Sequence, residues 1–270
     1  MRHDDRDRQQ RGEPTGGQQR APATGARVAP RSGYEGHSYE TAAALARPDA
    51  GRGVPSATAG PGGDALGAAA ADLSARHGDA LSAAAARAGV PAPALAAVVL
   101  TEAAGLGEVE PGALPIRFEP YVFWQRTGSW VVATHRDQTA EQNALAAARS
   151  IDEGAALASL RMGLGQLSGA EASAAGYADA AAMYAAFSTD SAAQIAALGE
   201  VVAADATLQG ALGSEDWCHV AALRAGPAYH AIGYDDGLAA AAAAYAEQVA
   251  HGGDDDGEDA RPRRRRGDRR

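Results

Sequence analysis

Apolar residues recur with helical spacing along most of the chain, from about residue 64 to residue 251. Stretches rich in Ala, Leu and Val alternate with Gly, Pro and Asp, the residues that start and stop helices. This pattern predicts a mainly α-helical core. No internal repeat is evident in it, so we expect one domain over 64–251 rather than an array of repeats.

The start and stop residues divide the core into separate helices. They predict helices over 64–78, 79–89 and 91–105. The stretch 108–123 contains several Pro and Gly residues and an alternating Ile-Arg-Phe segment, which indicates a loop with a short extended piece or a small hairpin. Helices are expected again over 138–149 and 153–161, with later N-caps at Ser168 (in capping-box spacing with Glu171), Asp179, Asp190, Ser214 and Asp235.

Both ends of the chain lack this periodicity. Residues 1–63 are rich in Arg, Gln, Gly, Pro, Asp and Ser, and residues 252–270 pass from an acidic run into an Arg-rich run. Such segments bury too little apolar surface to offset the entropy lost on ordering, so we expect two disordered tails. Tyr34 and Tyr39, beside a short Ala-Leu run, are an exception. There, a docking segment for a partner is the alternative to a plain linker.

Charge narrows the function classes. The chain has 24 basic side chains, all of them Arg, and 34 acidic ones. Subtracting the nine Arg and seven acids of the first tail, and the seven Arg and six acids of the second, leaves eight Arg and 21 acids in the core. The core therefore has a strongly negative net charge, which argues against nucleic-acid binding by this domain.

The sequence also argues against a disulfide-bonded protein, a membrane-inserted protein and a protein that depends on a metal or cofactor. The single cysteine, Cys218, excludes an internal disulfide and is expected to be a small buried apolar residue. We expect no membrane insertion, because no apolar run reaches the length of a membrane span. We expect no metal and no cofactor either, because the seven His are scattered without an HExxH pair and no phosphate-binding loop is evident.

One acidic residue is distinctive because it extends an apolar helical face. Leu95, Val98, Val99 and Glu102 follow the i, i+3, i+4, i+7 spacing of residues on one side of a helix. A carboxyl group at that position is partly desolvated, which raises its pKa, and a carboxylic acid with a raised pKa donates a proton at neutral pH. The alternative is that Glu102 turns out to water near the helix end.

The segments around and after Glu102 form an ordered series over residues 80–248. PALAAVVLTEAAGLG closes the third helix, PIRFEPYVFW follows it, and LRMGLGQLSG, RAGPAY and GYDDG come later. In this order they resemble the N-acetylmuramidase family of phage-type endolysins, in which a Glu-Ser-Gly-Gly-like motif closes an Ala-Val-rich helix. The matching positions are Glu102, Gly105, Gly107, Phe118, Glu119, Phe123, Trp124, Gly163, Leu164, Gln166, Gly169, Gly176, Tyr177, Asp216, Trp217, Gly226, Pro227, Tyr229, Gly233, Tyr234 and Asp235.

The resemblance implies a lysozyme-like fold and cleavage of peptidoglycan between N-acetylmuramic acid and N-acetylglucosamine. Glu102 would protonate the glycosidic oxygen, and a second carboxylate would stabilise the developing cation or activate water. Glu119 is the matched second carboxylate, with a structural residue that bonds backbone amides as the alternative. Glu108 and Glu110 are further candidates, with solvated loop acids as their alternative.

Three side chains are candidate substrate-binding residues. Gln166 would hydrogen-bond a sugar acetamido group or brace its own glycine-rich loop. Tyr229 and Tyr234 would stack on a pyranose ring or pack their loop onto the core. Trp217 is expected in the core.

The sequence also departs from the family pattern. Arg161-Met162 replaces Ser-Trp, Gly165 replaces Phe, and Arg224-Ala225 replaces Tyr-Asn. Loss of an aromatic platform and an amide weakens sugar binding, because stacking and paired hydrogen bonds orient a polar ligand. The alternative to a hydrolase is therefore a degenerate module that binds cell wall, or an accessory subunit of a phage tail or tail-like injection particle attached through the tails.

Location follows from the start of the chain. The N-terminus is polar and lacks the apolar segment of a secretion signal. We expect accumulation in the cytoplasm, followed by release or delivery to the cell wall, with the peptidoglycan glycan strand as the main partner.

Overall fold

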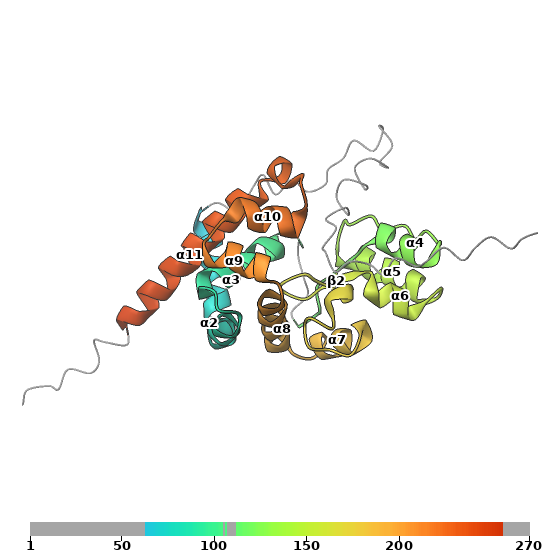
Figure 1. The fold of residues 1–270 in the computed structure, drawn as a ribbon, viewed down its shortest axis with the longest axis horizontal. Helices are drawn as coiled ribbons and strands as arrows, with labels where there is room; N and C mark the ends of the chain where they lie inside the picture. The colour runs from blue at the N-terminus through green and yellow to red at the C-terminus, as the bar shows by residue number, and fades with distance from the viewer. Residues whose placement is uncertain (1–62, 105, 107–111, 256–270) are drawn as a thin grey trace, which may run out of the picture. The chain divides into compact units, whose positions relative to one another are not determined.

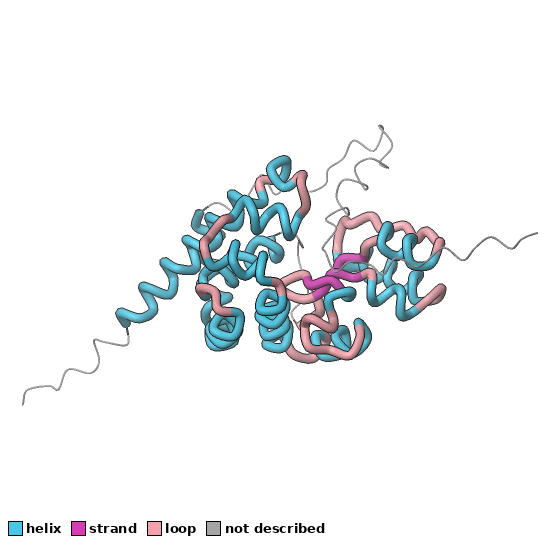
Figure 2. Tube along the Cα trace, viewed as in Figure 1, coloured by secondary structure: helices cyan, strands magenta, loops and turns pink. Residues whose placement is uncertain are grey.

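The computed structural model describes residues 63–104, 106 and 112–255. This part of the chain is mainly helical, as the sequence predicted, with one small sheet (Figures 1 and 2). The predicted tails lie almost entirely outside the described residues. The exception is the last helix, which continues to Asp255 and so passes the predicted boundary at residue 252.

Helix α2 (Gly63–Ala88) is continuous where the sequence predicted two helices. The predicted break at Gly78 was wrong. A glycine inside a helix costs only about 1 kcal/mol relative to alanine. Helix α2 gains more than this by packing against its neighbours α3 (Ala92–Ala104), α8 (Ser191–Ala204) and α11 (Tyr234–Asp255). Leu81 and Ala84, which follow the glycine, are buried in these contacts.

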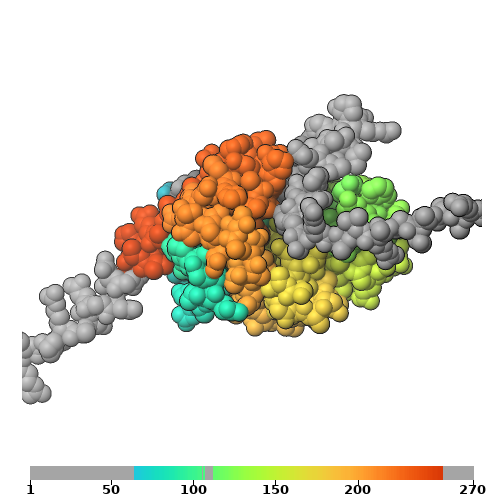
Figure 3. Space-filling view, viewed as in Figure 1, coloured from blue at the N-terminus to red at the C-terminus, as the bar shows by residue number. Residues whose placement is uncertain are grey.

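Helix α3 (Ala92–Ala104) is the buried helix of the core. Every residue from Ala94 to Leu100 is buried. Its neighbours are α2, α9 (Ala206–Gly213) and α11 (Tyr234–Asp255), whose many alanines allow close approach. Figure 3 shows the teal surface of α2 and α3 beside the orange surface of the later helices, which include α9, a neighbour of α3. The fold therefore fixes the end of α3, where Glu102 lies.

Aspartate side chains open four of the later helices. These helices are α7 (Ala180–Phe187), α8 (Ser191–Ala204), α9 and α10 (Trp217–Ala225), and the caps are Asp179, Asp190, Asp205 and Asp216. The first two caps were predicted correctly. Ser214 instead ends α9, and Asp235 lies in the first turn of α11, so those two predicted caps were wrong.

The sheet joins segments far apart in the sequence. β1 (Ile116–Phe118), β2 (Leu160–Met162) and β3 (Leu167–Ser168) form an antiparallel sheet in the order β1-β2-β3, with Arg117 opposite Arg161. The predicted extended piece is confirmed as β1, but its partner is β2 rather than a local strand. The helix predicted over 153–161 is shorter in the structure, where α6 covers Glu153–Ala158. It ends there because the buried residues that follow form β2 and pair with β1.

Two further helices lie beside the sheet. α5 (Gln138–Arg149) contacts β1 and α6, and α4 (Pro120–Thr127) contacts α6. Glu141 of α5 is buried, and its Oε2 accepts a hydrogen bond from the backbone N–H of Phe118 at 2.8 Å. Its Oε1 lies 2.7 Å from His135 Nδ1. This buried carboxylate joins α5 to the sheet, and the sequence analysis missed it.

Gly169 begins the short helix η1 (Gly169–Glu171) after β3, where the predicted capping box of Ser168 and Glu171 is confirmed. A Cβ at Gly169 would collide with the backbone carbonyl of Leu157. We expect Gly169→Ala to lower the free energy of unfolding by roughly 1–3 kcal/mol, measured by urea denaturation. Gly210→Ala is the matched control, because nothing lies within 4 Å of a Cβ there. An unchanged stability for Gly169→Ala would show that the close approach is absent.

None of the helices in the described part of the chain is by itself long and apolar enough to cross a membrane. Two bent pairs, α2 with α3 and α8 with α9, reach that length and composition together.

Candidate active site

Glu102 lies near the C-terminal end of α3 with its carboxylate held by three side chains. Tyr234 Oη donates a hydrogen bond to Glu102 Oε1 at 2.7 Å, and Arg224 Nη2 donates to the same oxygen at 3.1 Å. Arg161 Nη2 lies 3.9 Å from it. The Glu102 side chain is 13% exposed. We call these four residues the Glu102 cluster.

The two arginines connect separate elements. Arg224 comes from α10, is 3% exposed, and also donates to the backbone carbonyl of Gly165 at 2.6 Å. Arg161 comes from β2, and its Nε donates to the carbonyl of Gln166 at 3.1 Å. The Glu102 cluster therefore joins the end of α3 to α10, to the start of α11 and to the turn between β2 and β3.

The charges of the Glu102 cluster decide the protonation of its carboxyl group. Burial alone raises the pKa of Glu102, but the guanidinium groups of Arg161 and Arg224 and the hydrogen bond from Tyr234 together outweigh burial. The pKa is lowered from its ordinary value of 4.5. The predicted raised pKa was wrong, and the alternative of a solvated side chain does not hold either. Glu102 is therefore a carboxylate at neutral pH.

The two candidate tyrosines occupy different environments. Tyr234 is 7% exposed, and burial, with the Glu102 carboxylate, raises its pKa well above 10, so its hydroxyl remains a donor. Its ring packs in the core rather than presenting a face for stacking. Tyr229 begins the short helix η2 (Tyr229–Ile232), half-buried against the core, with its ring centroid 3.9 Å from that of His230.

Gln166 is buried in the turn between β2 and β3. It is 2% exposed, and its Nε2 donates to the carbonyls of Gly163 at 2.9 Å and Pro115 at 3.4 Å. Its own backbone takes a left-handed conformation, with φ of 46°. This geometry is the one expected if Gln166 braces the turn. Contact between this amide and a sugar remains a prediction and requires the turn to move.

Glu119 occupies the N-cap position of α4. Its backbone N–H donates to the carbonyl of Ser159 at 2.9 Å, but its side chain makes no capping bond. The buried carboxylate that does bond a backbone amide is Glu141. Glu108 and Glu110 lie outside the described residues. A second catalytic carboxylate therefore remains a prediction for Glu119.

Comparison with known proteins places this geometry in a family. The family model for N-acetylmuramidase matches residues 91–246, which include all four members of the Glu102 cluster. The chain belongs to the N-acetylmuramidase family. The solved structure of the endolysin of Burkholderia AP3 phage is similar, with a TM-score of 0.56 and 25% identity over 69% of this chain and 85% of that one. No curated protein matches the sequence significantly.

The two arginines beside Glu102 can now be compared with the expected family motifs. Arg161 and Arg224 are two of the residues at which the sequence analysis expected a departure from the family pattern. The structure shows that both departures lie beside Glu102. The family and the endolysin-like fold indicate a peptidoglycan hydrolase of the glycosidase type. Arg161 and Arg224 therefore affect the electrostatics of the Glu102 carboxylate directly.

Cys218, His230 and Asp235 lie close together near the start of α11. Cys218 is exposed, so the expectation of a buried thiol was wrong. Its Sγ lies 3.7 Å from Asp235 Oδ2, which is 3.1 Å from His230 Nδ1. Trp217 is half-buried against the core. Among the described residues, no group of three or more His, Cys, Asp or Glu is arranged to hold a metal ion.

Proposed function

We propose that this chain hydrolyses the glycan strand between N-acetylmuramic acid and N-acetylglucosamine, with Glu102 as the proton donor. The observation that carries the proposal is the position of Glu102, which ends the buried helix α3 inside the family match and keeps an exposed edge. Its hydrogen bonds from Tyr234 and Arg224 fix one carboxylate oxygen, as a positioned acid requires.

The proton balance sets a condition on this reaction. The proton of Glu102 passes to the glycosidic oxygen, and the bond from that oxygen to the sugar C1 breaks. Water then adds its oxygen to C1 and returns one proton to the carboxylate. Because the arginines keep Glu102 ionised at neutral pH, the donor form requires proton uptake. Hydrolysis should therefore be favoured by acid.

A second candidate function is binding of the cell-wall glycan without cleavage. The ion pairs between Glu102 and its two arginines favour it, because they stabilise the form of the carboxyl group that cannot donate a proton. Under this candidate, the Glu102 cluster holds α3, α10 and the β2–β3 turn together.

The end groups of released fragments separate these functions. Purified peptidoglycan is incubated with the full chain from neutral to mildly acidic pH, and the soluble products are analysed by mass spectrometry. We expect fragments with reducing N-acetylmuramic acid ends. Anhydro ends would indicate a lytic transglycosylase and overturn the hydrolytic step. Co-sedimentation with the wall but no fragments at any pH would favour the second candidate.

A further inference from the structure

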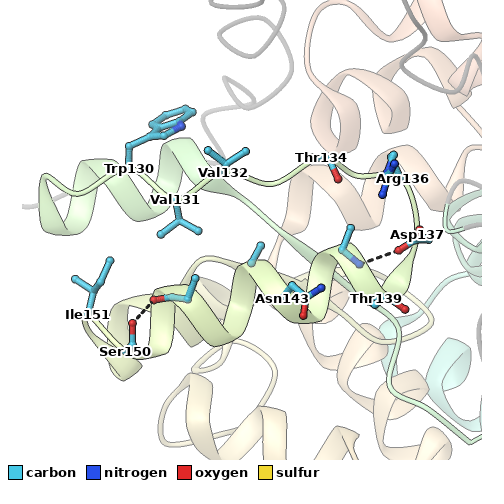
Figure 4. A pocket seen from close by; sticks show the side chains of 13 residues that line it. Trp130, Val131, Val132, Thr134, Arg136, Asp137, Thr139, Asn143, Ser150 and Ile151 are labelled. Atoms are coloured by element: carbon cyan, nitrogen blue, oxygen red, sulfur yellow. Dashed lines mark hydrogen bonds between the residues drawn. The ribbon is translucent and has the colours of Figure 1, made fainter.

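An open groove of about 830 Å³ lies between α5 and the loop formed by residues 129–137 (Figure 4). None of the residues of the Glu102 cluster lines it. The volume is in the range of sites that take small ligands, which is about 300–1,000 Å³. The groove is therefore a separate feature that hydrolysis at Glu102 does not explain.

One end of the groove is apolar and exposed. Trp130 is 54% exposed, Val132 71% and Ile151 51%. Figure 4 shows Trp130 on the loop on one side of the groove and Ile151 beyond the end of α5 on the other. Exposed apolar side chains gathered at one place mark binding surfaces more often than single scattered ones do.

Small side chains form the floor of the groove. Ala140, Ala144 and Ala147 lie on one face of α5, at positions i, i+4 and i+7, and line the groove. Their short side chains leave space for a flat ring to approach the helix. Figure 4 shows the Trp130 ring at the same end as Ile151, on the side of the loop away from α5. It therefore contributes an aromatic face at the rim of the groove rather than above this floor.

The other end of the groove is polar and has balanced charge. Thr139 and Asn143 are exposed there, and neither side chain makes a hydrogen bond with the described part of the chain. The only charged residues in the lining are Arg136 and Asp137, which offset each other, and Asp137 Oδ1 already accepts from the N–H of Ala140 at 2.8 Å. The lining therefore matches a neutral ligand with hydroxyl and amide groups.

We propose that this groove binds N-acetylhexosamine rings of the glycan strand outside the cleavage site. An N-acetylhexosamine has an apolar C–H face, which fits Trp130, and neutral hydroxyl and acetamido groups, which fit Thr139 and Asn143. The choice of glycan rests on the proposed function, whose substrate is a long polymer of such rings. Binding of one part of this polymer in the groove raises the effective concentration of the rest of the strand at the cleavage site.

Two other ligand classes fit less well. A polyanion needs a surplus of positive charge, but Arg136 is the only cation in the lining and Asp137 lies beside it. A partner helix needs a continuous apolar strip, but polar side chains occur along the whole groove, from Thr139 and Asn143 to Ser150 beside Ile151. A neutral sugar satisfies both ends.

The test uses Trp130 as its own reporter. The chain has three tryptophans, so the double variant Trp124→Phe, Trp217→Phe leaves Trp130 as the sole tryptophan. Titration of this full chain with the tetramer of N-acetylglucosamine at neutral pH should give a saturable change in fluorescence. Adding Ala147→Leu, which fills the floor, should weaken binding roughly three- to tenfold. No response, or the same affinity with and without the Ala147→Leu substitution, would overturn the proposal.

A second measurement compares matched tryptophans in the otherwise unchanged chain. Trp130→Ala should reduce co-sedimentation with purified peptidoglycan, whereas Trp124→Ala, an exposed tryptophan that does not line the groove, should not. Equal binding by the two variants, with equal melting temperatures, would contradict a site at Trp130. These binding readouts do not depend on cleavage. Failure of the proposed hydrolysis with an intact fluorescence response would therefore leave the groove standing.

Discussion

Replacing Glu102 with Gln is expected to lower the release of fragments from purified peptidoglycan by roughly 10²–10⁴-fold at mildly acidic pH. The amide keeps the shape and the acceptor oxygen of the carboxyl group but has no acidic proton to donate. Release is measured by chromatography of the soluble products, with equal amounts of folded protein. Full activity in the variant would show that Glu102 is not the donor.

The same substitution should also destabilise the fold. Arg224 and Arg161 are almost completely buried, and both pair with the Glu102 carboxylate. Replacing the carboxylate by a neutral amide breaks these buried ion pairs, and breaking a buried ion pair by removing one partner costs about 3 kcal/mol or more. Urea denaturation measures this loss. If Glu102 were instead a catalytic acid in an apolar pocket, its amide variant should be more stable than the wild type, because the substitution would remove a charge that is costly to bury.

A double variant separates loss of chemistry from loss of stability. Glu102→Gln combined with Arg224→Gln removes one of the two cations along with the carboxylate. We expect this variant to regain part of the lost stability, because contacting residues are not additive, while it remains inactive. Recovery of fragment release in the double variant would contradict the role of Glu102, since it would attribute the first loss to unfolding.

Replacing Arg224 with Gln alone is expected to raise fragment release at neutral pH at least several-fold. Arg224 lowers the pKa of Glu102, so its removal raises that pKa and increases the protonated fraction at any given pH. The amide of Gln retains a donor for the carbonyl of Gly165, which Arg224 bonds in the wild type. The measurement is the pH dependence of the release rate, whose acid-dependent rise should move to higher pH.

The matched control for Arg224→Gln is Arg224→Lys. Lysine keeps the positive charge and should retain the wild-type pH dependence, even if its different geometry lowers the rate at every pH. A purely structural role for Arg224 predicts that both variants lose rate without any movement of the pH profile. That outcome would contradict the electrostatic account of the Glu102 cluster.

Stability should follow pH in the opposite direction from activity. The folded-state pKa of Glu102 is lowered from 4.5. Its ion pairs therefore contribute their full stability above about pH 4.5, and this contribution is lost as the pH falls through the lowered value. The protonated form that donates is thus the form that no longer pairs with its arginines. Arg224→Gln should weaken both effects together.

The sequence predicted the main features of the fold because local patterns determine them. The apolar face of α3 identified a buried helix with Glu102 at its end, and the alternation around Arg117 identified β1. It could not show that β1 pairs with β2, because that contact joins segments more than forty residues apart. It also placed a break in α2, where tertiary packing outweighs the cost of Gly78.

Arg224 and Glu141, which the sequence analysis did not identify as buried charged residues, show the same pattern that identified Glu102. Arg224 follows Val220 and Ala221 on one buried face of α10, and Glu141 precedes Ala144 and Leu145 on one buried face of α5. These are the same spacings that identified Glu102. A charged residue on an apolar face requires a partner of opposite charge or strong hydrogen bonds. Two such faces with opposite charges therefore predict a buried ion pair, which is what Glu102 and Arg224 form.

The pH dependence of fragment release by the wild-type chain tests most directly whether Glu102 must take up a proton against its two arginines before it can cleave the glycan. The rate is measured on purified peptidoglycan from neutral to acid pH, within the range where the chain stays folded, beside Glu102→Gln. We predict a rate that rises as the pH falls and a rise that is absent from the variant. A rate that is highest at neutral or alkaline pH, or equal in the two proteins, would contradict the account.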